Sequence, residues 1–242
     1  MRPDDKKEVA PEAIPSTIAI DGPAGSGKST VGQRLAQALG YLYFDTGVMY
    51  RAVTWLALNR GVSVGDERVV SELAERIPID VEPLTEDDGR QFTVKADGED
   101  ITWSIREPDV EANVSRVSAY PAVRAALSAQ QRRIAGRGRI VMVGRDIGTV
   151  VIPGADMKIF LDASVEVRAR RRWSEEQARG TQRPFQEVLE DIRYRDRIDS
   201  TREVAPLRPA ADAWVIDSTG LSVDEVLRIV LDGLTEAQPD SN

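Results

Sequence analysis

Short apolar runs alternate with longer amphipathic segments along most of this 242-residue chain. Five runs rich in apolar and β-branched residues predict buried strands at 17–20, 41–44, 139–143, 157–161 and 213–217. Segments with helical periodicity lie between and beyond them: 31–39, about 46–60, part of 61–78, 107–117, 121–135, 164–200 and 221–234. Strands that alternate with helices predict a parallel sheet with helices on both faces.

Residues 79–103 have a different pattern. Short strands are expected near 79–81 and 91–95, with turn signals at Asp88-Gly89 and Asp97-Gly98. This segment therefore predicts a small antiparallel insertion in a single domain that spans 17–236. Residues 1–16 are charged and proline-containing, so we expect a disordered leader rather than a signal peptide, and 237–242 are expected to be a disordered tail.

The sequence Gly-Pro-Ala-Gly-Ser-Gly-Lys-Ser at 22–29 fits the G-x-x-x-x-G-K-[ST] pattern of a phosphate-binding P-loop. It joins a predicted strand to a predicted helix, where free backbone N–H groups and the helix dipole favour an anion. Lys28 can reach the β- and γ-phosphates, and the Ser29 hydroxyl can ligate Mg²⁺. The predicted nucleotide-binding residues are Gly22, Pro23, Ala24, Gly25, Ser26, Gly27, Lys28, Ser29 and Thr30.

Composition removes several kinds of chemistry. The chain has no cysteine and no histidine, which excludes disulfides, thiol nucleophiles and imidazole bases, and fits a reducing cytoplasm. Its net charge of −8 disfavours non-specific binding to nucleic acid or to an anionic membrane. No stretch approaches about 18 apolar residues, so no membrane span is expected.

One segment is basic in this acidic protein. Residues 168–202 contain ten arginines and seven acidic residues, which indicates a polyphosphate site. Arg168, Arg171 and Arg172 have the spacing of one helix face and could surround a transferred phosphoryl group. A solvated helix with ion pairs is the alternative. Breaks at Gly180, Thr181 and Pro184 could form the hinge of a lid that excludes water.

Other classes of P-loop protein fit poorly. There is no N-K-x-D guanine motif, and the predicted strand at 139–143 ends in Gly-Arg-Asp rather than in an acidic pair. These features favour phosphoryl transfer between two small molecules over a signalling GTPase or a motor. A kinase for another small acceptor, a nucleotide-binding regulatory module without turnover, and a nucleic-acid-binding protein remain alternatives.

The chain resembles bacterial cytidylate kinases from Thr17 to Leu234. The motifs that carry the resemblance are Ile-Asp-Gly-Pro at 20–23, Asp-Thr-Gly-Val-Met-Tyr-Arg at 45–51, Gly-Arg-Asp-Ile-Gly-Thr-Val-Val at 144–151, Lys-Ile-Phe-Leu-Asp-Ala-Ser at 158–164, Arg-Glu-Val-Ala-Pro-Leu at 202–207 and Ala-Asp at 211–212. The resemblance implies a parallel five-stranded P-loop core, an insertion at about 62–135 that binds a nucleoside monophosphate, and a helical lid at about 165–185.

The resemblance also implies roles for residues around the acceptor. Arg51 would hold the acceptor phosphate, Asp199 and Arg202 would hold the ribose and phosphate, and Arg195 would contact phosphate from the lid. Arg145 would support the phosphate or the base. Arg168, Arg171 and Arg172 would correspond to the arginines of the family's lid. Lys28, Arg51, Arg168, Arg171 and Arg195 are therefore the predicted catalytic residues.

For the base, the resemblance selects Thr46, Ser115, Arg124 and Asp146. Many relatives have serine where this chain has Thr46, and the hydroxyl is kept. These residue types fit cytosine, because its amine needs an acceptor such as Asp146, whereas uracil would place an oxygen against that carboxylate. The expected reaction is Mg²⁺-dependent transfer from ATP to CMP or dCMP, by a monomer in the cytoplasm.

Overall fold

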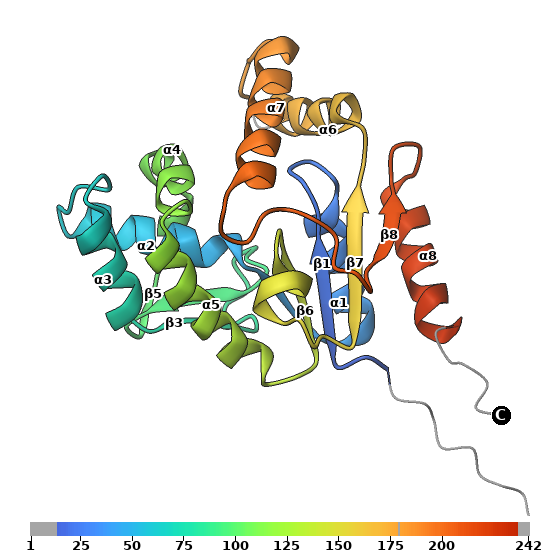
Figure 1. Ribbon diagram of the computed structural model, residues 1–242, viewed down its shortest axis with the longest axis horizontal. Helices are drawn as coiled ribbons and strands as arrows, with labels where there is room; N and C mark the ends of the chain where they lie inside the picture. The colour runs from blue at the N-terminus through green and yellow to red at the C-terminus, as the bar shows by residue number, and fades with distance from the viewer. Residues whose placement is uncertain (1–13, 179, 237–242) are drawn as a thin grey trace, which may run out of the picture.

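A five-stranded parallel sheet forms the centre of the computed structural model, which describes residues 14–178 and 180–236 (Figure 1). The strand order is β2-β6-β1-β7-β8, and every neighbouring pair is parallel. The strands are β1 (Thr17–Asp21), β2 (Leu42–Asp45), β6 (Ile140–Gly144), β7 (Met157–Asp162) and β8 (Trp214–Asp217). The predicted five-stranded parallel core is confirmed.

Helices cover both faces of this sheet. In chain order the helices are α1 (Lys28–Leu39), α2 (Gly47–Asn59), α3 (Glu67–Arg76), α4 (Pro108–Val117), α5 (Pro121–Ala135), α6 (Val165–Ala178), α7 (Phe185–Thr201) and α8 (Val223–Glu236), with the short η1 (Ser104–Arg106) and the π-helix η2 (Ile147–Val151). The helices α3 and α4 lie beyond the sheet, and α6 and α7 stand above its carboxyl edge (Figure 1). Neighbouring side chains of a strand point to opposite faces, so Ile20 of β1 faces α1 while Asp21 faces η2.

The inner strands explain the continuous apolar runs in the sequence. β6 is buried at all five positions, and β1 is buried at four of five, because both lie in the middle of the sheet under helices. β8 is an edge strand and alternates less cleanly, with Val215 exposed and Ile216 buried. Strands in the middle of the sheet are thus more deeply buried than the edge strand β8.

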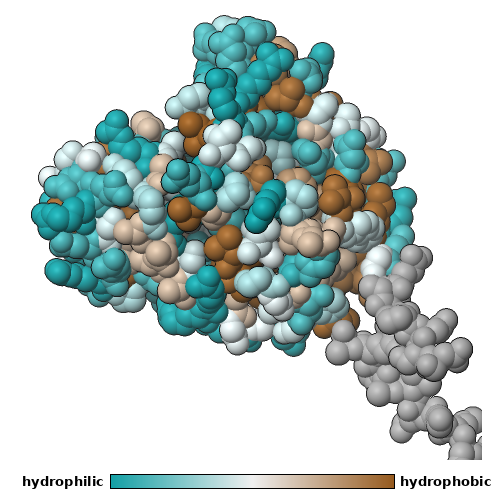
Figure 2. All heavy atoms as spheres, in the orientation of Figure 1, coloured by the Kyte–Doolittle hydropathy of each residue, from teal (hydrophilic) through white to brown (hydrophobic). Residues whose placement is uncertain are grey.

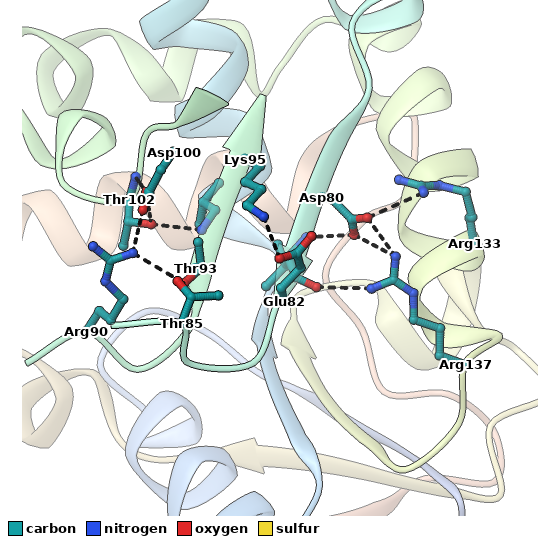
Figure 3. Close-up of polar contacts among 12 residues, drawn as sticks. Asp80, Glu82, Thr85, Arg90, Thr93, Lys95, Asp100, Thr102, Arg133 and Arg137 are labelled. Carbon is teal, nitrogen blue, oxygen red and sulfur yellow. Dashed lines mark hydrogen bonds and ion pairs between the residues drawn. The ribbon is translucent and has the colours of Figure 1, made fainter. Parts of the chain in front are cut away.

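The segment between α3 and α4 carries the predicted insertion as a three-stranded antiparallel sheet (Figure 3). Its strands are β3 (Ile79–Glu82), β4 (Thr93–Ala96) and β5 (Glu99–Asp100), and the last was not foreseen. Asp97 and Gly98 both have positive φ and make the tight turn between β4 and β5. Ion pairs fasten this sheet to α5 and to the turn after it, since Asp80 lies 3.6 Å from Arg133 of α5 and 2.7 Å from Arg137, just beyond that helix.

Two local features of the structure differ from what the sequence led us to expect. The first helix begins at Lys28 instead of residue 31, because Gly27 takes a left-handed conformation and lets the helix start directly after the loop. The π-helix η2 had no signal in the sequence pattern.

The charged pair of helices that follows β7 is present as α6 and α7, and hydrophilic side chains cover most of it (Figure 2).

The predicted leader and tail fall largely outside the described residues, which exclude 1–13 and 237–242. Within the described part, Ser16 already joins the sheet, as its carbonyl accepts a hydrogen bond from Ile140 N at 3.0 Å. Across residues 14–178 and 180–236, none of the helices combines the length and the apolar character needed to cross a membrane.

The close packing of α1 on β6 gives a testable prediction at Gly32. A Cβ there would lie 2.5 Å from Val143 Cγ2, a distance that requires the packing to shift. Alanine normally favours a helix by about 1 kcal/mol, but overpacking costs about 1–3 kcal/mol. We expect Gly32→Ala to lower the free energy of unfolding by about 1–2 kcal/mol in urea titrations.

The control is the same substitution in a Val143→Ala protein, where the clashing methyl group is gone. There, Gly32→Ala should raise stability. A loss of similar size in both backgrounds would contradict the packing explanation.

Candidate active site

The carboxyl ends of the parallel strands meet at one edge of the sheet. Register places Asp21 of β1 beside Gly144 of β6 and Phe160 of β7, and Asp45 of β2 beside Val143. Two cavities lie at this edge, and Arg195 of α7 lines both of them. A group held in one cavity therefore lies next to a group held in the other, as transfer between two ligands requires.

The first cavity, of about 420 Å³, lies over the P-loop. Close approach of the loop to β7 and α6 requires glycine, because a Cβ on Gly22 would lie 2.1 Å from the Leu161 carbonyl oxygen. The predicted residues that line this cavity are Ala24, Gly25, Ser26, Gly27, Lys28, Ser29 and Thr30, joined by Arg171, Arg172 and Arg195. Gly22 and Pro23, which were also predicted, begin the loop and do not line this cavity.

Lys28 begins α1 and is buried beneath the loop, where Nζ donates a hydrogen bond of 2.9 Å to the Pro23 carbonyl. The pKa of Lys28 is lowered to about 7, mainly by burial and secondly by the nearby guanidinium of Arg145. An anion in the cavity would relieve both effects. The positive charge around the loop is thus not fully balanced by nearby carboxylates, and it favours the binding of a polyphosphate.

Ser29 and Asp45 form an oxygen-rich corner between the two cavities. The Ser29 hydroxyl donates to Asp45 Oδ2 at 3.3 Å, while Asp45 Oδ1 accepts from Gly47 N at 3.0 Å. Asp45 was not among the predicted site residues, although its place at the end of a predicted strand, within the 45–51 motif, is a signal that could have marked it. Its neighbour Thr46 donates its hydroxyl to the Val143 carbonyl.

The second cavity, of about 190 Å³, brings together side chains from α2, α4, α5 and α7, from the end of β2, and from the segments that follow β6, α4 and α7. It contains every acceptor residue that the resemblance selected: Thr46, Arg51, Ser115, Arg124, Arg145, Asp146, Asp199 and Arg202. Tyr50, Tyr194 and Ile198 also line it, and the sequence analysis did not select them. Tyr194 and Ile198 are exposed on α7, so they form an apolar part of the wall.

A buried ion pair lies at the base of the second cavity. Arg124 Nη2 donates to Asp146 Oδ2 at 2.7 Å, and the two side chains are only 6% and 9% exposed. The guanidinium also lies 5.5 Å from the centre of the Tyr50 ring, a cation–π contact. Arg202 approaches the other carboxylate oxygen at 3.6 Å. Asp146 therefore presents an acceptor whose position is fixed by two cations.

Further carboxylates hold the arginines around this cavity. Arg145 pairs with Asp199, and Arg51 pairs with Glu111 of α4, a residue that the sequence did not reveal. Burial lowers the pKa of Arg195, and the neighbouring Arg145 charge lowers it further. This gathering of guanidinium groups creates a positive potential suited to phosphate groups.

The three lid arginines have different positions. Arg171 and Arg172 line the first cavity, and Arg171 donates to the Ser26 carbonyl at 3.2 Å. Arg168 lies outside the lining of both cavities and is buried; it donates to the Ala24 carbonyl and pairs with Asp196 of α7 at 2.6 Å. Arg168 of α6 thus links that helix to α7 and to the P-loop.

A P-loop cavity beside an arginine-lined cavity, both at the carboxyl edge of a parallel sheet, defines a P-loop phosphotransferase. The family model for cytidylate kinase matches residues 18–236. The chain belongs to the cytidylate kinase family.

Curated relatives agree with this assignment. The chain is 50% identical to a cytidylate kinase of Chloroflexus aggregans over 218 residues, covering 90% of this chain and 93% of the relative. It is 51% identical to that of Herpetosiphon aurantiacus over 217 residues, with the same coverage. Among solved structures, an uncharacterized protein from Eubacterium ventriosum shares the fold with a TM-score of 0.52 at 10% identity, covering 90% of this chain and 98% of that one.

The buried pair at the base of the second cavity predicts a large loss of stability in one variant. Arg124→Ala leaves Asp146 buried without its nearest cation, so we expect the free energy of unfolding to fall by about 3 kcal/mol. Arg68→Ala is the control, because it removes an exposed pair with Glu72 on α3 and should cost less than about 0.5 kcal/mol. Urea titrations of both variants measure the difference. Equal losses would show that burial of the pair has no special cost.

Proposed function

We propose that this protein transfers the γ-phosphoryl group of ATP to CMP and dCMP, giving ADP with CDP or dCDP. The observation that carries the proposal is the shared Arg195 wall between a P-loop cavity and a cavity with the acceptor residues of cytidylate kinases. Family membership supports the use of ATP and of a nucleotide acceptor. We further propose that the enzyme acts as a monomer in the cytoplasm.

On the donor side, the P-loop N–H groups and Lys28 would hold the ATP phosphates. Magnesium fits the corner between Ser29 and Asp45, because Mg²⁺ prefers oxygen ligands and these two side chains offer them 3.3 Å apart. In the described ranges 14–178 and 180–236, no group of three His, Cys, Asp or Glu side chains could hold a metal alone. Phosphate oxygens and water would supply the remaining ligands, and the ion would offset charge on the phosphates.

On the acceptor side, the pairing of Arg124 with Asp146 supports recognition of cytosine. The Asp146 carboxylate would accept from the exocyclic amine, while Arg124 and Ser115 would donate to the ring nitrogen and the carbonyl oxygen. Thr46 would contact the same base. Arg51 and Arg202 would hold the phosphate, Asp199 the ribose, and Arg145 would stabilise this arrangement through Asp199.

Transfer would need no side-chain nucleophile. An oxygen of the acceptor phosphate is already anionic at neutral pH and would attack the γ-phosphorus directly. Arg171, Arg172 and Arg195 would stabilise charge that develops on the transferred group, and Arg168 would hold α6 and α7 over the P-loop. We propose that the segment at about 165–185 closes as a lid over the site. We also propose that the insertion at about 62–135 binds the nucleoside monophosphate.

The direct test is ADP release from ATP and Mg²⁺ with CMP, dCMP, UMP or AMP as acceptor. We expect rapid turnover with CMP and dCMP, slow turnover with UMP, and loss of turnover in Lys28→Ala. Asp146→Asn should reduce the preference for CMP over UMP by about 10- to 100-fold, because an amide can donate to uracil. ATP binding without turnover on any acceptor would contradict the proposal, and equal turnover with UMP would contradict the cytosine selectivity.

The pKa of Lys28 predicts how ATP binding depends on pH. Only the protonated ammonium attracts phosphate, and burial places its pKa at about 7. The affinity for ATP should therefore fall as pH rises above 7, by up to about tenfold per unit, as linkage requires. Calorimetry between pH 6 and 9 measures this. A Lys28→Arg variant keeps its charge and should show a flat profile; a slope equal to that of the wild type would exclude Lys28 as the cause.

A further inference from the structure

Asp21 is a buried carboxylate for which the proposed transfer chemistry gives no role. It ends β1, directly before the P-loop, and its residue is only 4% exposed. Its two oxygens accept hydrogen bonds from the backbone N–H groups of Ile147 and Gly148, each at 2.8 Å. These are the first two residues of the π-helix η2, which lies across the sheet from α1. Asp21 therefore caps a helix to which it is not joined in sequence.

Asp146 immediately precedes the same helix. An aspartate in that position ordinarily turns its own carboxylate back to accept from the first free N–H groups. Here the Asp146 side chain makes no capping hydrogen bond. Its oxygens instead face Arg124 at 2.7 Å and Arg202 at 3.6 Å, inside the acceptor cavity. Two of the N–H donors that a capping carboxylate of Asp146 would use are occupied by Asp21.

We propose that Asp21 is a positioning residue for acceptor recognition: by capping η2 in place of Asp146, it keeps the Asp146 carboxylate turned toward the base. The inference rests on the proposed function, in which Asp146 reads cytosine. It also means that one residue connects the two substrates, because the chain continues from Asp21 into Gly22 of the P-loop.

The surroundings of Asp21 support a charged cap. Burial raises the pKa of Asp21 to about 6, opposed by the hydrogen bonds from Gly148 and Ile147, so the carboxylate is ionised at neutral pH. The N-terminal end of a helix favours a negative charge. Space is also limited, since a Cβ on Gly148 would lie 3.4 Å from Asp21 Oδ2 and 3.2 Å from Lys158 Cδ. The carboxylate thus fits closely against the backbone that it caps.

Asp21→Asn tests the proposal, because asparagine has nearly the same size but can offer only one oxygen. Its NH₂ group would face a backbone N–H, and one cap would be lost. We expect KM for CMP to rise about tenfold, the preference for CMP over UMP to fall by a similar factor, and KM for ATP to change less than about twofold. Asp156→Asn is the matched control: its carboxylate accepts from Thr17 at the opposite end of β1, and acceptor kinetics should not change.

A double-mutant cycle separates positioning from general destabilisation. With Asp146 already changed to Asn, the additional Asp21→Asn substitution should leave the CMP to UMP preference unchanged, because the carboxylate to be positioned is absent. The same loss of preference in both backgrounds would overturn the proposal. So would an Asp21→Asn enzyme whose KM for CMP equals that of the wild type.

Amide hydrogen exchange gives a readout that is independent of turnover. In Asp21→Asn, the amides of Ile147 and Gly148 should exchange at least about tenfold faster, while the α3 amides stay unchanged. Unchanged exchange at 147 and 148 would overturn the capping role. Failure of the wild type to phosphorylate CMP would instead contradict the proposed function, so the two failures are distinguishable.

Discussion

Arginine charge at the carboxyl edge of the sheet is the constraint on which the site depends. A buried guanidinium costs several kcal/mol unless a carboxylate compensates it. The compensating groups come from distant parts of the chain: Asp146 follows β6, Asp196 and Asp199 lie on α7, and Glu111 lies on α4. Each ion pair therefore also joins two segments, and the charge that would serve phosphate binding helps to define the tertiary structure.

The sequence predicted the framework well because the framework depends on local patterns. Buried parallel strands are apolar on both faces, and the P-loop has a fixed spacing of glycine, lysine and serine. The candidate acceptor residues came from a resemblance, since nothing local distinguishes Ser115 or Arg124 from a surface residue on a helix. Their gathering in one cavity results from the packing of α2, α4, α5 and α7.

Other features could not be predicted, for physical reasons. Arg168, Arg171 and Arg172 lie close together in the sequence, and only the contacts with α7 and the P-loop distinguish Arg168, which links these segments, from Arg171 and Arg172, which line the first cavity. The π-helix η2 depends on a carboxylate that lies more than 120 residues earlier in the chain. Long-range hydrogen bonds of this kind have no signature within a sequence window.

The capping of η2 by β1 has a consequence for protein engineering. Exchange of the 144–151 loop between P-loop kinases is a natural route to a new acceptor preference, because this loop carries Arg145 and Asp146, which we propose as acceptor residues. In this fold the loop does not bring its own cap, so a transplant without an aspartate at the end of β1 would leave two buried N–H groups unsatisfied. The transferable module is therefore discontinuous: the loop together with the residue at position 21.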